Sequence, residues 1–113
     1  MQKDDLIYVG IMLDIARQAV AKASRSTRQD FDDDENLRLA LTHLIQMIGE
    51  TARRLSPAFR EQHPETPWHE IIGMRHRVVH DYLDIDYPEV WKVATQDLPV
   101  LITQLEPIAP PAP

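Results

Sequence analysis

The sequence predicts an all-α protein, folded as an antiparallel up-and-down four-helix bundle. Three observations support this: apolar residues recur at three- and four-residue spacing over long stretches, prolines and polar runs separate these stretches, and no β-hairpin pattern occurs. With 113 residues, the chain is long enough to bury one hydrophobic core. We therefore expect one helical domain over residues 1–106 and a flexible proline-rich tail over residues 107–113.

The first helix is predicted to begin at Asp4 or Asp5, either of which can cap it, and to end near Ser24. Residues 24–29 show no periodicity and are expected to form a loop. The apolar seam of this helix consists of Leu6, Val9, Leu13, Ala16 and Val20.

A second amphipathic helix is predicted between residues 37 and 55. The acidic residues 32–35 are expected at its N-terminus, where the macrodipole favours negative charge, rather than in a calcium loop, which would need a glycine. Gly49 lies within its apolar part and indicates close helix packing there. Residues 56–57 end this helix, and Phe59 in the next short turn is expected to close the end of the bundle.

The third helix is predicted to run from Trp68 to about Tyr82 and to be followed by a turn at residues 84–88. Pro88 begins a fourth helix. Pro99 lies inside this helix and is expected to kink it or split it in two, because proline removes a helical hydrogen bond.

Composition excludes several classes of function. The chain has no cysteine, which rules out a disulfide framework, a thiolate metal site and a cysteine nucleophile. Its three glycines cannot form a glycine-rich phosphate loop, and we expect no cofactor. The net charge of −6 argues against broad, non-specific nucleic-acid binding. Because the sequence has no signal-peptide pattern and no apolar run of membrane length, we expect a cytoplasmic protein that does not contact membranes.

Basic and aromatic side chains gather in residues 73–82, which read Gly-Met-Arg-His-Arg-Val-Val-His-Asp-Tyr. On a helix, Arg75 and Tyr82 would lie close to one line, and His76 and His80 would lie on the adjacent line. A guanidinium, an imidazole and a phenol could therefore meet at one helix surface.

Three interpretations of this stretch compete. The first is structural, because a helix end carries cations that suit its negative C-terminus. The second is zinc binding by His76, His80 and Asp84, although Arg77 stands where zinc proteases have a glutamate. The third is metal-independent cleavage of RNA, in which His80 exchanges protons and Arg75 binds phosphate oxygens. One helix supplies one such pair, so a symmetric dimer would supply two, one for the base and one for the acid.

Arg75, His80 and Tyr82 resemble the signature of the HEPN superfamily, in which four residues separate the arginine from the histidine and one separates the histidine from the tyrosine. The surrounding residues 67–75 and 79–82 are similar to its HepT-type branch in particular. The similarity also covers residues 48–55 in the second helix and, in the last helix, residues 90–91 and 97–99.

The resemblance implies a helical homodimer with the motif at the dimer cleft. It implies the toxin of a type VII toxin–antitoxin system, a ribonuclease with Arg75 and His80 as the catalytic pair and with tRNA as one candidate substrate. It also implies a partner, an MntA-like nucleotidyltransferase antitoxin that transfers AMP from ATP to Tyr82. The added phosphate would obstruct the cleft and compete there with RNA phosphate.

In one respect the sequence departs from this branch, because the residue after the motif arginine is His76 instead of the typical asparagine. His76 and Arg77 are therefore open candidates for substrate contact, and no metal ligand is assigned. The alternative function is a non-catalytic helical binding subunit of a nucleotidyltransferase complex, with Tyr82 as a contact or as the modified residue. The acidic net charge favours this alternative over general RNA binding.

Overall fold

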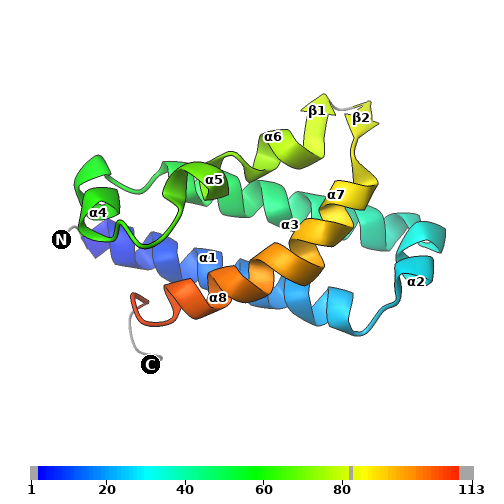
Figure 1. The fold of residues 1–113 in the computed structure, drawn as a ribbon, viewed down its shortest axis with the longest axis horizontal. Helices are drawn as coiled ribbons and strands as arrows, with labels where there is room; N and C mark the ends of the chain where they lie inside the picture. The colour runs from blue at the N-terminus through cyan, green and yellow to red at the C-terminus, as the bar shows by residue number, and fades with distance from the viewer. Residues whose placement is uncertain (1–2, 82, 110–113) are drawn as a thin grey trace.

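The computed structural model describes residues 3–81 and 83–109, and most of these residues are helical. Two long helices, α1 (Lys3–Ser24) and α3 (Glu35–Arg53), pack against each other and run in opposite directions (Figure 1). The short helices α5 (Trp68–Ile72) and α6 (Met74–Val78) pack along α3. The last helical segment consists of α7 (Tyr87–Lys92), which packs on α3, followed by the π-helical turn η1 (Val93–Asp97) and α8 (Leu98–Leu105), which pack on α1. The other elements are α2 (Arg28–Asp33), α4 (Pro57–Gln62), β1 (Val79–Asp81) and β2 (Asp84–Ile85).

Helices dominate the fold, as the sequence predicts, and they share one core. The apolar seam of α1 is confirmed, because Val9 and Ala16 are fully buried, and α3 contributes Leu41, Ile45 and Ile48 to the same cluster. The regular four-helix bundle and the symmetric dimer stay predictions. No helix in the described part of the chain is both long enough and apolar enough to cross a membrane.

The predicted cap of the first helix is wrong, because Asp4 and Asp5 both lie inside α1. Asp5 serves a different helix. Asp5 is 2% exposed, and its carboxylate accepts hydrogen bonds from the backbone N–H and the hydroxyl of Ser56, both at 2.8 Å. Ser56 in turn caps α4 by accepting a hydrogen bond from the N–H of Phe59. Asp5 therefore ties the start of α1 to the start of α4.

Replacing Asp5 with alanine is expected to lower the free energy of unfolding by about 1–3 kcal/mol, because the N–H of Ser56 would lose its acceptor in a buried place. Urea denaturation followed by circular dichroism measures this loss. The matched control is Asp4→Ala, which removes an exposed carboxylate and should change stability by less than about 0.5 kcal/mol. Equal stability of the two variants would contradict the prediction.

The loop after α1 is shorter than predicted. Residues 28 and 29 already belong to α2, because Thr27 forms a capping box with Asp30: the Thr27 hydroxyl accepts from the Asp30 N–H at 3.0 Å, and the Asp30 carboxylate accepts from the Thr27 N–H at 2.9 Å. Asp34 and Glu35 begin α3 as predicted, since the carboxylate of Asp34 accepts from the Leu37 N–H at 3.2 Å. Asp32 and Asp33 instead lie in the last turn of α2.

The close packing predicted at Gly49 is confirmed. A Cβ atom at this position would lie 3.3 Å from the carbonyl oxygen of Ile72 and 3.4 Å from that of Ile71. Glycine therefore lets the end of α5 approach α3 backbone to backbone. At the end of α3, the chain turns as predicted, and Phe59 of α4 is 1% exposed and plugs this end of the core.

The predicted third helix is wrong beyond its first turns. It divides at Gly73 into α5 and α6, and α6 ends at Val78. Residues 79–81 form strand β1, which pairs in antiparallel fashion with β2 and so gives the chain a small hairpin that the sequence pattern did not reveal. Two local features favour this ending: Val79 is β-branched, and the Asp81 carboxylate accepts the Leu83 N–H at 2.8 Å across the turn.

The last segment agrees with its prediction at both prolines. Pro88 lies in the first turn of α7, which is capped by Asp86, although residues 84–85 form a strand where a turn was predicted. Pro99 lies in the first turn of α8, directly after the π-helical turn, so the helix is split as expected. The tail boundary at residue 107 stays a prediction; Ile108 packs against the core, and residues 110–113 lie outside the described part.

Candidate active site

Arg75 lies in the first turn of α6, and its side chain is 45% exposed. Its Nη1 atom lies 3.3 Å from Oε1 of Glu50 on α3. The neighbouring Gly49 favours this approach, because a Cβ there would stand 3.3 Å from the carbonyl oxygen of Ile72, which is closer than most Cβ contacts. The glycine thus brings the motif helix close enough to α3 for Glu50 to reach the motif arginine.

Glu50 is a site residue that the sequence reasoning missed. Its Oε1 atom also lies 3.6 Å from Nη1 of Arg53, so the carboxylate lies between two guanidinium groups. Both ion pairs are exposed to solvent, and such pairs contribute little to stability. Glu50 therefore orients Arg75 while leaving the guanidinium free to exchange this carboxylate for an anionic ligand. The sequence feature that could have indicated Glu50 is its position directly after Gly49, the glycine that marks the close contact of α3 with α5.

Around this pair, the surface is hollowed into an open depression of about 440 Å³. It is lined by Arg75 together with His43, Gln46, Met47, Glu50 and Arg53. A second depression of about 280 Å³ shares Met47 and Glu50 with the first and extends to α1 through Tyr8 and Ile11. The two depressions together extend from α6 over α3 to α1 and are lined by charged, polar and apolar side chains.

His80 lies on β1, beyond the end of α6, and its side chain is exposed. The prediction that Arg75 and His80 share one helix is therefore wrong, because the chain leaves the helix at Val78. The same change removes the helical spacing of His76 and His80 on which the zinc interpretation depended. Within residues 3–81 and 83–109, no group of three or more histidine, aspartate or glutamate side chains could hold a metal ion.

Arg77 is held in place by two carboxylates. Its guanidinium donates to Glu89 through Nε at 3.1 Å and through Nη2, and Nη2 also lies 3.0 Å from Oδ2 of Asp97. Partial burial by itself lowers the pKa of Arg77, but the two carboxylates outweigh it and raise the pKa above the ordinary value for arginine. Arg77 thus ties α6 to α7 and η1, and its contact with substrate stays a prediction.

The other two motif residues are His76 and Tyr82. His76 is exposed on α6, and a substrate contact there stays a prediction. Tyr82 lies outside the described residues; its neighbours Asp81 and Leu83 are both exposed. In chemical terms, one chain offers a solvent-accessible guanidinium for an anion and a solvent-accessible imidazole for proton transfer.

Comparisons with known proteins point to one family. The profile of a family described as "Ribonuclease HepT-like" matches residues 12–108. Curated relatives include "Putative RNase MJ1380" of Methanocaldococcus jannaschii, 28% identical over 93% of this chain and 96% of the relative. A protein named "Putative RNase TTE0752", from Caldanaerobacter subterraneus, is 35% identical over 71% of each chain, and "Probable ribonuclease HepT" of Thermococcus cleftensis is 32% identical over 69% of this chain and 71% of its own. No solved structure matches the chain.

Proposed function

This chain belongs to the HepT-like ribonuclease family of the HEPN superfamily, and from this premise we propose that it is a ribonuclease that acts as the toxin of a toxin–antitoxin system. The observation that carries the proposal is that both motif side chains are exposed, Arg75 on α6 at the edge of an open surface depression and His80 on the adjoining strand β1. The exposed Glu50 carboxylate occupies the place on Arg75 that a phosphate of RNA would take.

The proposed reaction is metal-independent cleavage of the RNA backbone. One His80 removes the proton from a ribose 2′-hydroxyl, whose oxygen then attacks the adjacent phosphorus. Arg75 stabilises the negative charge that develops on the non-bridging oxygens. The bond from phosphorus to the 5′-oxygen breaks, and a second imidazole donates a proton to that oxygen. The products are a 2′,3′-cyclic phosphate and a free 5′-hydroxyl.

A symmetric dimer would supply the second imidazole, because each chain contributes one motif histidine. Exposed apolar side chains beside the Arg75 depression support this assembly: Met47 on α3 is 38% exposed, and Ile11 and Ile7 on α1 are 41% and 50% exposed. Apolar surface of this kind favours contact with another protein surface. A dimer formed there would place both Arg75 side chains near the twofold axis.

Replacing Met47 with lysine is expected to weaken the dimer and to lower RNA cleavage in parallel. Two lysine charges would repel each other across a symmetric contact, and the contact would lose the apolar surface of both Met47 side chains. Analytical ultracentrifugation measures the association, and a cleavage assay at the same concentrations measures the activity. The matched control is Val100→Lys, which places the same charge at an exposed apolar position on α8. A wild type that is monomeric and active would contradict the dimer.

The test of the function is a cleavage assay with unmodified protein. Total cellular RNA is incubated with protein that has been treated with EDTA and checked by intact mass for the absence of adenylyl groups. We expect cleavage that leaves 2′,3′-cyclic phosphate ends, and protein carrying His80→Ala controls for contaminating nucleases. No cleavage of any RNA class by the unmodified dimer would overturn the proposal.

Regulation is proposed to act through Tyr82. Its phenolic oxygen would attack the α-phosphorus of ATP in the active site of a nucleotidyltransferase antitoxin, pyrophosphate would leave, and the hydroxyl proton would pass to a base or to water. The added AMP carries negative charge two residues from His80, where it would repel RNA phosphate.

Replacing Tyr82 with phenylalanine is expected to abolish rescue by the antitoxin, because the ring stays but the oxygen that accepts AMP is lost. Growth of cells that coexpress both proteins, together with intact mass of the purified toxin, measures the effect. Tyr87→Phe is the matched control, since this tyrosine lies on α7 and packs against the core. A Tyr82→Phe protein that still gains adenylyl groups would contradict the assignment of the acceptor.

The alternative function is a non-catalytic binding subunit of a nucleotidyltransferase complex. The observation that favours it is the acidic balance of the chain, with a net charge of −6, together with the Glu50 carboxylate on Arg75. Toxicity on expression without the nucleotidyltransferase separates the two functions, because a binding subunit alone has no reason to arrest growth.

A further inference from the structure

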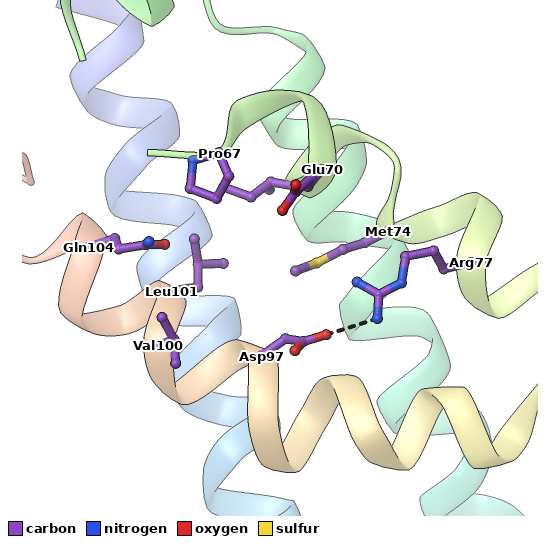
Figure 2. Close-up of a pocket in the computed structure, with 9 residues that line it drawn as sticks. Pro67, Glu70, Met74, Arg77, Asp97, Val100, Leu101 and Gln104 are labelled. Atoms are coloured by element: carbon purple, nitrogen blue, oxygen red, sulfur yellow. Dashed lines mark hydrogen bonds and ion pairs between the residues drawn. The ribbon is translucent and has the colours of Figure 1, made fainter. Parts of the chain in front are cut away.

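A cavity of about 310 Å³ lies between α5 and α6 on one side and α8 on the other (Figure 2). Its floor is apolar and consists of Ile71, Met74 and Leu101, each at most 5% exposed. Figure 2 shows Glu70 and Asp97 at separate points of its wall, with Met74 between them. None of these residues belongs to the depression around Arg75.

The polar groups of this cavity carry an excess of negative charge. Glu70 is exposed, and its carboxylate forms no hydrogen bond or ion pair with the described part of the chain. Asp97 binds Arg77 through Oδ2, but its Oδ1 atom accepts no hydrogen bond from the described residues, and its side chain stays 32% exposed. Arg77, the cation of the cavity wall, is already shared with Glu89. The cavity thus keeps free acceptors and offers no unpaired cation among its lining residues.

Asp97 reaches this position through an irregularity of the last helix. It ends the π-helical turn η1, in which the N–H of Leu98 bonds to the carbonyl of Val93, and Pro99 follows with no N–H to continue the α-helical pattern. Such π turns occur often at functional sites. Beside it, Val100 is 54% exposed at the edge of the cavity. An apolar floor, two available carboxylates and an exposed valine therefore lie together.

We propose that this cavity docks a protein partner that inserts one arginine or lysine side chain. The aliphatic part of that side chain packs on Met74 and Leu101, and its cationic end binds between Glu70 and Asp97. An apolar neighbour in the partner covers Val100. The size of the cavity suits one long side chain, and its carboxylates repel the phosphates of RNA. The proposal does not depend on the ribonuclease activity.

The test uses two fluorescein-labelled hexapeptides and the full-length protein. In the first peptide a single arginine stands between two leucines; in the second, citrulline replaces the arginine and has nearly the same shape without the charge. Fluorescence anisotropy at low salt should show saturable binding of the arginine peptide and about tenfold weaker binding of the citrulline peptide, since two carboxylates lose their cation.

Variants locate the binding site. Glu70→Gln should weaken binding of the arginine peptide about two- to fivefold, and Val100→Lys should weaken it further, because it removes an apolar contact and repels the charge of the peptide. Glu61→Gln on α4 removes another exposed carboxylate outside the cavity and should leave binding unchanged. Circular dichroism confirms that each variant is folded.

Four results would overturn the proposal. The first is equal affinity of the arginine and citrulline peptides, and the second is no binding of either peptide. The third is Glu70→Gln protein that binds as the wild type does. If Val100→Lys instead dissociates the protein into smaller species in the ultracentrifuge, the cavity contacts a second copy of this chain, and the docking of a different partner is refuted.

Discussion

Replacing His80 with alanine is expected to slow RNA cleavage by about 10²- to 10⁴-fold, the range over which a positioned acid–base group accelerates a reaction. The fold should survive, because the side chain is exposed on β1 and forms no hydrogen bond with the described residues. Thermal unfolding should therefore stay close to that of the wild type, with a change below about 0.5 kcal/mol. Loss of activity would then report chemistry rather than stability.

A matched control makes this prediction sharper. His69→Ala removes an exposed histidine on α5 and should keep the wild-type rate. An unchanged rate in His80→Ala would remove this residue from the mechanism.

Replacing Arg75 with alanine is expected to slow cleavage by about 10²- to 10³-fold, the usual effect of losing one donor to a developing oxyanion. Its side chain is 45% exposed and forms one solvent-exposed ion pair, with Glu50, so the guanidinium can turn to a phosphate at small cost. Arg75→Lys should recover only part of the rate, because an ammonium keeps the charge but lacks the planar fork that matches two phosphate oxygens.

Single-turnover cleavage separates this effect from weaker binding. Protein is kept in excess over RNA and at a concentration above the dissociation constant of the protein–RNA complex. Arg25→Ala is the control, because it removes an exposed arginine directly after α1. It removes the same positive charge as Arg75→Ala and therefore the same general attraction for RNA. An Arg75→Lys protein as fast as the wild type would show that charge alone suffices. An Arg75→Ala protein as fast as the wild type would exclude the arginine from the reaction.

The sequence by itself determined the parts of the molecule that depend on local pattern. The apolar spacing located α1 and α3, because a helix repeats its buried face every three to four residues whatever it packs against. Pro99 located the split in the last helix, because its missing N–H acts within one turn. The motif residues Arg75 and His80 were likewise visible as a spacing in the chain.

Only the tertiary structure decided how these residues are presented. The helix that carries Arg75 ends at Val78, because strand pairing with residues 84–85 competes there with the helix. The spacing of apolar residues within one segment gives no information about such a partner strand. The hydrogen bond of Asp5 to Ser56 spans 51 residues, and that of Arg75 to Glu50 spans 25. Contacts over such separations depend on how closely whole elements approach, as Gly49 allows here, and a local pattern cannot encode that distance.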